Sequence, residues 1–338
     1  MKVIQIQDDW SMDNIRLAER PDPRPGPGEV LVRMKAASLN YRDLVVPLRG
    51  YGALTGTLPL IPISDGVGEV AALGEGVTRV NSGDRVCPMF HQKWTAGAPT
   101  MERITSTLGG PIDGVMAEYR VFSQESVAKV PDHLSDVEAA TLPCAALTAW
   151  SALVTDGDVK AGASVLIQGT GGVSLFALQF AKLLGARAIV ISSSDEKLAR
   201  ARALGADEGL NYRTNREWGK AVRDLAGGDG IDHIVEVGGE KTLSQSLRAI
   251  RPGGTISVIG VLSGSMMDVR LGMVVTRYVR LQGITVGHRD GFEAMTRAIG
   301  QHKLRPVIDR VFAFEELRAA FDHLKSGTHF GKICIRHQ

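Results

Sequence analysis

The chain has 338 residues, a length typical of two domains, and its composition of 44% hydrophobic and 22% charged residues is normal for a globular enzyme with a sizeable core. Its formal net charge of +2, from basic residues spread along the chain, gives no general attraction to nucleic acid or to a membrane surface. We see no secretory signal and no apolar run long enough to cross a bilayer. Three widely spaced cysteines (Cys87, Cys144 and Cys334) predict free thiols, and therefore a cytoplasmic protein.

The first part of the chain has the pattern of a β-rich unit. Up to about residue 145, short apolar runs such as 30–34, 66–74 and 84–87 are separated by glycine and proline. This rhythm is typical of an all-β, barrel-like fold. The polar stretch 91–113 indicates a loop.

The central part of the chain alternates between strand and helix patterns. Strands are expected at 164–168, 187–192, 208–212, 232–237, 255–260 and 280–286, with helices that include 173–184, 195–204 and 241–250. This alternation predicts a parallel sheet with helices on both faces. Beyond residue 290, helices are expected at 292–301 and 315–325, and a last strand at 332–335. We therefore expect an α/β protein with a catalytic domain (1–145 and 288–338) and a dinucleotide-binding domain (146–287).

The most informative segment is 165–174, where an apolar strand meets a cluster of glycines. Gly169 allows a tight turn out of the strand, while Gly171 and Gly172 remove side chains that would hold a pyrophosphate away. The helix that begins near Val173 directs its free N–H groups at the anion. Ser174 stands where the usual third glycine would be, and serine is small enough for close packing of helix on strand. The segment predicts a dinucleotide site, against the alternative of an ordinary strand-to-helix turn.

Further motifs follow one another along the whole chain in a familiar order. They are Pro-Gly-Glu-Val-Leu-Val at 27–32, Ser-Leu-Asn-Tyr-Arg-Asp at 38–43, Asp-Gly-Val-Gly at 65–68, Gly-Asp-Arg-Val at 83–86, Leu-Thr-Ala at 147–149, the glycine turn, Arg-Pro-Gly-Gly at 251–254 and Gly331-Lys332. In this order the chain resembles the medium-chain dehydrogenase/reductase superfamily, and within it the zinc-independent quinone oxidoreductase and enoyl reductase branch. The resemblance implies a β-rich GroES-like catalytic domain joined to a Rossmann domain with a doubly wound parallel sheet.

The resemblance also bears on metal binding. A catalytic zinc needs three protein ligands from Cys, His and Asp or Glu. In the zinc enzymes of this superfamily the ligand positions correspond to Asn40, Ser64 and Cys144 here, so one ligand type of three remains. The cysteine cluster of a structural zinc lobe is absent, since residues 88–143 contain no cysteine. We therefore expect no metal.

Without a metal, another group must stabilise the charge that develops on the substrate. Hydride addition to a conjugated C=C–C=O system places negative charge on the carbonyl oxygen, which then needs hydrogen-bond donors and later a proton. The catalytic candidates are Tyr51, which the resemblance places near the substrate, and Asn40, with Tyr41 as a further donor. Tyr51 has the alternative of a loop residue that only packs on the domain.

Cofactor choice is expected to depend on the end of the second strand of the dinucleotide domain. NAD enzymes place an acid there, whereas this chain has Ser192 and Ser193, which leave room for a 2′-phosphate. The resemblance adds Lys197 and Tyr212 as phosphate contacts, and the cofactor is expected to be NADPH. The alternative is that Ser193 and Glu196 only form a helix capping box. By position, the resemblance implies further cofactor contacts at Asn40, Thr148, Gly238, Gly260, Gly331 and Lys332.

These features predict an NADPH-dependent reductase of quinones or α,β-unsaturated carbonyl compounds that acts on a small molecule without zinc. One alternative is a zinc-independent alcohol dehydrogenase or aldehyde reductase, and another is a dinucleotide-binding protein without catalytic activity. The strand at 280–286 should be the last of the central sheet. Because exposed edges are usually covered or paired, we expect a homodimer joined at this strand, as in related reductases.

Overall fold

The computed structural model describes residues 1–266 and 271–337. The chain divides into two compact units, the first formed by 1–147 with 286–338 and the second by 148–285. We call them unit 1 and unit 2. That unit 1 is the catalytic domain and unit 2 the dinucleotide-binding domain stays a prediction.

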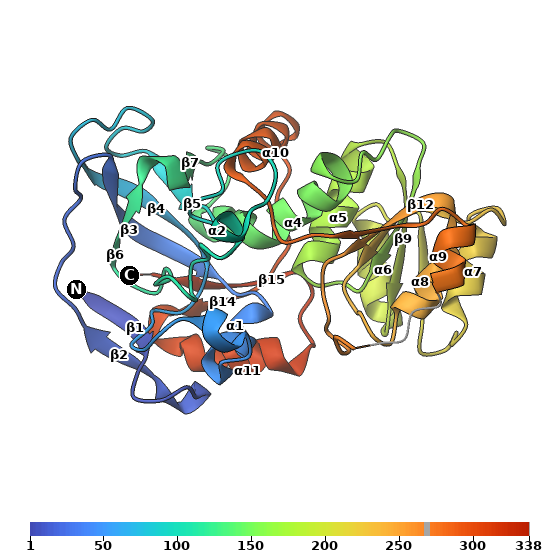
Figure 1. Ribbon diagram of the computed structural model, residues 1–338, viewed down its shortest axis with the longest axis horizontal. Helices are drawn as coiled ribbons and strands as arrows, with labels where there is room; N and C mark the ends of the chain where they lie inside the picture. The colour runs from blue at the N-terminus through green and yellow to red at the C-terminus, as the bar shows by residue number, and fades with distance from the viewer. Residues whose placement is uncertain (267–270, 338) are drawn as a thin grey trace. The chain divides into compact units, whose positions relative to one another are not determined.

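Unit 1 is built on a β-sheet with strand order β14-β15-β3-β4-β5-β7, while β6 also pairs with β3 and β1 with β2 (Figure 1). Its strands are β1 Lys2–Ile6, β2 Ile15–Glu19, β3 Glu29–Ser38, β4 Asp65–Leu73, β5 Arg85–Pro88, β6 Tyr119–Ser123, β7 Val127–Lys129, β14 Ile308–Ala313 and β15 Lys332–Arg336. Its α-helices are α1 Arg42–Val45, α2 Met101–Ile104, α3 Asp136–Ala139, α10 Arg289–His302 and α11 Leu317–Ser326.

The long strand β3 organises unit 1. Val30, Val32 and Met34 are buried at alternate positions and point into the core, as a strand with one covered face requires. On the neighbouring strand β4, a Cβ at Gly68 would lie 2.4 Å from the backbone oxygen of Arg33, so only glycine allows β3 and β4 to approach so closely here. The antiparallel pairing of β3 with β4, β6 and β15 gives the GroES-like architecture that the sequence predicts.

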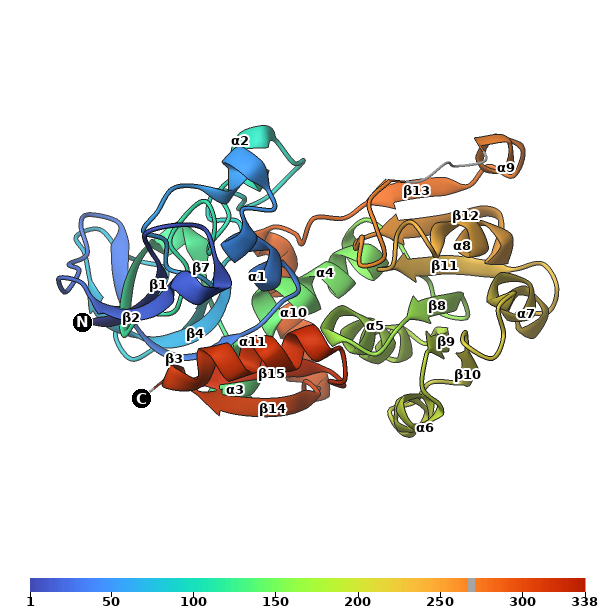
Figure 2. The same cartoon turned by 90° about the horizontal axis from the view of Figure 1, so that it is seen from below.

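Unit 2 contains a six-stranded parallel sheet with order β10-β9-β8-β11-β12-β13 (Figure 2). Its strands are β8 Ser164–Gln168, β9 Arg187–Ser192, β10 Glu208–Asn211, β11 Ile231–Glu236, β12 Ile250–Val258 and β13 Arg280–Gly283. Its α-helices are α4 Leu147–Trp150, which begins at the last residue of unit 1, α5 Gly172–Leu183, α6 Asp195–Ala203, α7 Trp218–Leu225, α8 Leu243–Ala249 and α9 Leu271–Thr276.

The central strands of this sheet are covered on both faces. Val165, Leu166 and Ile167 of β8 are each 0% exposed, although neighbouring residues of a strand point to opposite faces. Continuous apolar strands of this kind are typical of parallel sheets between two helix layers. The order reverses between β8 and β11, as expected for a doubly wound sheet. The predicted Rossmann fold is confirmed.

The structure corrects several expected boundaries. The strand expected at 280–286 ends at Gly283, and the one expected at 255–260 begins at Ile250. Helix α7 and strand β14 were not expected; β14 has exposed or half-buried residues throughout, so its apolar periodicity is weak. The segment 91–113 contains helix α2 and packs Trp94 and Leu108 into the interior, so it is more than a polar loop.

A further correction concerns apolar length. Residues 136–155 form a continuous 20-residue helical stretch with a mean hydropathy of 1.4, long enough in principle to cross a membrane. However, 78% of its most apolar window is buried inside the protein, as in a core helix. Two parts of the stretch, Leu142–Ala146 and Ser151–Thr155, have π-helical hydrogen bonding, an irregularity often found at functional sites.

Candidate functional site

The glycine turn of unit 2 has the geometry that a phosphate requires. Gly169 follows β8 with φ = +74°, a conformation that costs other residues about 1–2 kcal/mol. Gly171 is the N-cap of helix α5, and a Cβ added there would meet no atom within 4 Å. Ser174 Oγ donates to the backbone oxygen of Gln168 at 2.6 Å, so serine closes the helix onto the strand in place of a third glycine. The turn therefore leaves open space in front of free helix N–H groups, beside Gly172 and Val173.

The ends of β9 and β10 lie side by side, as cofactor selection requires. Ser192 pairs with Asn211, and its backbone oxygen accepts from the N–H of Tyr212 at 3.1 Å. The cap of helix α6 is Ser194, whose Oγ accepts from the Lys197 N–H, so the alternative of a capping box at Ser193 is wrong. Ser193 is thus left half-buried beside the strand end. Asp195 and Glu196 are exposed on the first turn of α6.

Gly238 and Gly260 follow β11 and β12, and each is needed for packing within unit 2. A Cβ at Gly238 would lie 2.3 Å from Thr242 Oγ1, and one at Gly260 would lie 2.4 Å from the Val237 oxygen. Loop packing therefore accounts for both glycines, and their contact with a cofactor stays a prediction. Thr148 is buried in helix α4, close to the start of unit 2.

A buried polar network that we call the Glu236 cluster (Glu236, Gln168, Thr242 and Ser246) lies at the ends of β8 and β11. Glu236 is 0% exposed, and Gln168 Nε2 donates to its Oε2 at 2.6 Å. The same oxygen accepts from Ser246 Oγ, while Oε1 accepts from Thr242 Oγ1 and from two backbone N–H groups. We did not predict this cluster. Gln168 and Glu236, the polar last residues of two strands whose immediately preceding residues are apolar, were the signal in the sequence.

Unit 1 contains a second polar group, which we call the Lys332 cluster (Lys332, Asn40, Ser64 and Asp65). Together with the backbone of Cys144, it joins four segments that are far apart in the sequence. Lys332, at the start of β15, is 2% exposed, and its Nζ donates to Asn40 Oδ1 at 2.6 Å and to the Leu39 backbone oxygen. Ser64 Oγ donates to Asp65 Oδ1 at 2.8 Å, and the Cys144 N–H donates to Asp65 Oδ2 at 3.0 Å. Burial raises the pKa of Asp65, and the nearby Lys332 ammonium opposes that rise.

The three positions that correspond to zinc ligands meet in this cluster, but their chemistry does not suit zinc. Asn40 offers an amide, Ser64 a hydroxyl, and only Cys144 a possible thiolate. Burial raises the pKa of the Cys144 thiol, which disfavours the anion that a metal needs. The Lys332 ammonium already binds the amide oxygen, and its charge would repel a metal cation. Over residues 1–266 and 271–337, no three His, Cys, Asp or Glu side chains are placed to hold a metal ion.

Tyr51 lies near the same cluster on an exposed turn. Its side chain is 45% exposed, and the Arg42 guanidinium lies 5.9 Å from its ring centroid. Burial raises the pKa of Tyr51, with Arg42 opposing and Asp43 and Cys144 adding to the rise, so the phenol keeps its proton near neutral pH. Arg42 itself is held by the backbone oxygens of Leu108 and Gly110, and Asp43 accepts from the Asn40 N–H. These two residues hold the segment in place, as expected.

The structure thus brings together Asn40, Lys332 and the region of Tyr51 in unit 1, and the glycine turn with the ends of β9 and β10 in unit 2. Gly331, with φ = +97°, precedes Lys332, and a Cβ there would lie 2.3 Å from the Val307 oxygen.

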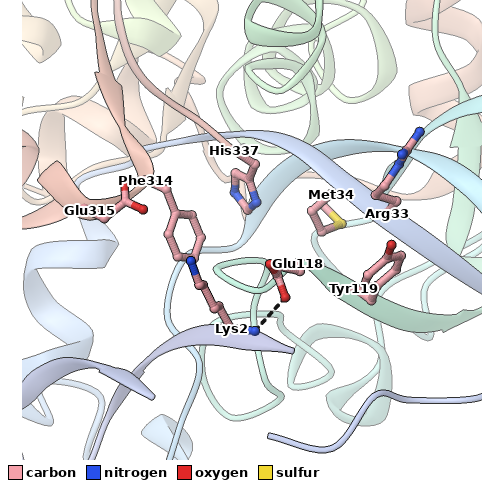
Figure 3. Close-up of a pocket in the computed structure, with 8 residues that line it drawn as sticks. All are labelled: Lys2, Arg33, Met34, Glu118, Tyr119, Phe314, Glu315 and His337. Carbon is pink, nitrogen blue, oxygen red and sulfur yellow. Dashed lines mark hydrogen bonds between the residues drawn. The ribbon is translucent and has the colours of Figure 1, made fainter. Parts of the chain in front are cut away.

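A pocket of about 140 Å³ lies elsewhere in unit 1, around His337 and Phe314, and its lining includes none of the predicted site residues (Figure 3).

Comparisons with known proteins agree with this architecture. Residues 26–132 match the family described as alcohol dehydrogenase GroES-like domain, and residues 172–301 match the family described as zinc-binding dehydrogenase. A zinc-type alcohol dehydrogenase-like protein of Schizosaccharomyces pombe is 42% identical, over 92% of this chain and 91% of its own. A crystal structure of a putative alcohol dehydrogenase from Sinorhizobium meliloti 1021 is 45% identical, with a TM-score of 0.93, over 99% and 98% of the two chains.

Other similar proteins carry different names. A structure named NAD-dependent alcohol dehydrogenase is 34% identical, with a TM-score of 0.91, over 99% of both chains. Acryloyl-coenzyme A reductase of Metallosphaera sedula is 28% identical, over 94% of this chain and 95% of its own. The quinone oxidoreductase of Coxiella burnetii is 27% identical, with a TM-score of 0.81, over 100% of this chain and 99% of that one.

Proposed function

The chain belongs to the medium-chain dehydrogenase/reductase superfamily of NAD(P)H-dependent oxidoreductases, and from this premise we propose that it reduces quinones or α,β-unsaturated carbonyl compounds with NADPH and without zinc. The Lys332 cluster carries this proposal. A buried ammonium and a neutral amide lie together where a zinc enzyme would gather metal ligands. The names of two relatives, an acryloyl-coenzyme A reductase and a quinone oxidoreductase, fit this substrate class.

In this proposal unit 2 holds the dinucleotide, which when bound supplies the hydride. The N–H groups at the start of α5 bind the pyrophosphate, and Gly171 leaves the space for it. Ser192, Ser193, Lys197 and Tyr212 surround the 2′-phosphate. In unit 1, Asn40 donates to the carbonyl oxygen, and Tyr51 supplies a proton.

The preference for NADPH over NADH rests on charge. No acid ends β9, and Glu196 is exposed on α6, whereas Asp195 Oδ1 accepts from Asn211 Nδ2 at 3.0 Å at the end of β10. A charged hydrogen bond to phosphate contributes roughly 1.5–3 kcal/mol, or about 10-fold to 100-fold in affinity. Lys197→Ala should therefore raise the Michaelis constant for NADPH and leave that for NADH nearly unchanged, with Lys220→Ala on the exposed face of α7 as a control. Equal use of both cofactors by the wild type would contradict this proposal.

Zinc independence is tested by metal analysis of the purified protein. We expect well under one zinc per chain and full activity in the presence of a chelator. About one tightly bound zinc per chain, together with loss of activity on chelation, would overturn this part of the proposal.

The substrate class is tested with a panel of quinones, enones, aldehydes and ketones. We expect NADPH oxidation to be fastest with an enone or a quinone. The second candidate is a zinc-independent alcohol dehydrogenase or aldehyde reductase. The names of the two most similar proteins described above favour alcohol dehydrogenase activity, although one of them is named zinc-type. Faster turnover of aldehydes would establish that alternative, while tight NADPH binding with no turnover would indicate a binding protein.

We also propose a cytoplasmic homodimer. Strand β13 is at the edge of the sheet, and Leu271, Val275, Tyr278 and Leu281 are exposed on or beside it. An apolar edge strand of this kind is usually covered, here by the same strand of a second copy. The unpaired state of Cys87, Cys144 and Cys334 supports a reducing compartment. A monomer in light scattering at micromolar concentration would refute the dimer.

A further inference from the structure

The Lys332 side chain is unusual because it is buried without the close ion pair that normally accompanies a buried lysine. It is 2% exposed, and the hydrogen bonds described for its Nζ go to two neutral oxygens, Asn40 Oδ1 and the backbone oxygen of Leu39. Asp65 is near enough for the ammonium to lower its pKa, but the two groups are not in salt-bridge contact. The charge of Lys332 is therefore directed at the Asn40 amide.

This contact fixes which way the Asn40 amide faces. An ammonium can only donate, so the atom that faces it must be the oxygen Oδ1. The Nδ2 group must then face the other side, where it lies 3.5 Å from Ser64 Oγ. The Asn40 side chain also hydrogen-bonds to Asp65, where it opposes the rise in the pKa of that carboxyl. The contact with Ser64 is at the limit of a hydrogen bond, so the N–H on that side is only weakly held, and Asn40 is half-buried.

We propose that Lys332 is a positioning residue that orients and polarises the Asn40 amide, so that its weakly held N–H stabilises negative charge on the substrate's carbonyl oxygen. This inference rests on the proposed reductase function and deepens it. A fixed cation acts on the substrate through an amide, at the place where zinc enzymes of the superfamily use a metal. The resemblance implies a cofactor contact for Lys332, whereas its hydrogen bonds go to Leu39 and to Asn40, which we propose as a substrate contact.

Physical chemistry supports an effect of useful size. Hydrogen bonds in a chain polarise one another, and the effect is larger in a low-dielectric interior. Electron density drawn from Oδ1 toward the ammonium makes the N–H a stronger donor. Loss of one positioned donor to a developing oxyanion lowers kcat by about 10²–10³-fold in other enzymes.

The main competing explanation is that Lys332 only balances the buried charge of Asp65. Three variants separate the two roles. Lys332→Met removes the ammonium at nearly constant shape, and Lys332→Met with Asp65→Asn also removes the charge that would need balancing. Asn40→Asp keeps an acceptor for the Lys332 ammonium but removes the N–H donor. Lys325→Met, at an exposed position on α11, is the matched control.

The readouts are kcat, the Michaelis constant for NADPH and the midpoint of thermal unfolding. We expect Lys332→Met, the double variant and Asn40→Asp each to lower kcat about 100-fold, whereas loss of the cofactor contacts that the resemblance implies for Lys332 and Asn40 would raise the Michaelis constant for NADPH. Recovery of kcat in the double variant to within about 3-fold of wild type would overturn the proposal, because Lys332 would then only balance Asp65. A change in the NADPH constant with constant kcat would also overturn it.

The design remains decisive if a variant does not fold. Asn40→Asp leaves Lys332 and Asp65 in place, so a folded Asn40→Asp protein with kcat within about 3-fold of wild type contradicts the proposal by itself. All variants are assayed with an enone and with an aldehyde. If the wild type reduces only the aldehyde, the proposed substrate class fails, while the variant-to-wild-type ratio still tests the role of Lys332.

Discussion

The Glu236 cluster and the Lys332 cluster differ in how completely their polar atoms are hydrogen-bonded. In the Glu236 cluster of unit 2, both carboxylate oxygens accept hydrogen bonds from side chains or backbone N–H groups of the same unit. In the Lys332 cluster of unit 1, the Asn40 amide is held firmly at its oxygen, while its Nδ2 has only a 3.5 Å contact with Ser64 Oγ beside its hydrogen bond to Asp65. Close to that cluster, Tyr51 is 45% exposed with its hydroxyl protonated.

This difference separates a structural network from a reactive one. In a saturated network every buried donor and acceptor is hydrogen-bonded within the protein. Such a network fixes loop geometry, and none of its groups can bind a ligand without losing an internal hydrogen bond. An unsaturated one costs stability, because polar groups are buried or constrained without full compensation, but it keeps donors in place for a substrate. Four changes would break or sharpen this comparison.

The largest expected effect is on Tyr51. Tyr51→Phe should lower the rate of enone reduction by ~10²–10⁴-fold, the range for a positioned general acid, with little change in NADPH binding. Steady-state kinetics with a stopped-flow measurement of hydride transfer would test this. Tyr119→Phe is the control, since Tyr119 lies on β6 and is none of the predicted site residues. An unchanged rate for Tyr51→Phe would assign this tyrosine to packing.

The next effect concerns the glycine turn. Gly171→Ala should leave the free energy of unfolding nearly unchanged, because its Cβ meets no atom within 4 Å and φ is −80°. The same Cβ enters the space proposed for the pyrophosphate, so NADPH should bind about 10-fold to 100-fold more weakly, as for loss of a charged hydrogen bond. Fluorescence titration measures the affinity. Gly300→Ala in helix α10 should leave it unchanged, and equal binding by both variants would contradict the assigned site.

A smaller effect is expected in the saturated network. Glu236→Gln places an NH₂ group against donors whichever way the amide turns, because donors face both carboxylate oxygens. We expect a loss of about 1–3 kcal/mol in the free energy of unfolding, measured by urea denaturation. Asp229→Asn, at an exposed position, should change it by less than about 0.5 kcal/mol. Unchanged stability of Glu236→Gln would mean that the network is less closed than its hydrogen bonds indicate.

The effect that is smallest over any single pH unit is a pH slope in the free energy of unfolding from Asp43. Burial raises the pKa of this carboxyl from 3.8 to about 7, although Arg42 opposes the rise. Between about pH 4 and pH 7 the folded state keeps a proton that the unfolded chain has lost. Its contribution to the free energy of unfolding therefore falls as pH rises through this window, by at most about 1.4 kcal/mol per pH unit.

Asp43→Asn should remove this part of the slope, while its amide oxygen can still accept from the Asn40 N–H. Denaturation curves collected from pH 4 to pH 7 would show the difference. Asp132→Asn, at an exposed position, should leave the slope as in wild type. A slope that persists in Asp43→Asn would have to come from other buried groups.

The two units also differ in how far the sequence predicted them. The glycine turn could be located because all its parts lie within ten consecutive residues, and a positive φ at Gly169 leaves few alternatives to glycine. The alternation of strand and helix around it predicted the Rossmann sheet and placed the 280s strand at its edge. Strand β14 was missed because its apolar pattern is weak. The alternative of a helix cap at Ser193 was wrong because the adjacent Ser194 is the N-cap of α6.

The sequence by itself determined the local features of this protein: the β-rich start, the parallel sheet and the glycine turn. These depend on periodicity, on backbone conformation and on side-chain chemistry, which act over a few residues. Only the tertiary structure decided that the Lys332 ammonium faces the Asn40 amide, 292 residues away along the chain. That contact depends on the antiparallel pairing of β15 with β3, a long-range register that no local pattern contains.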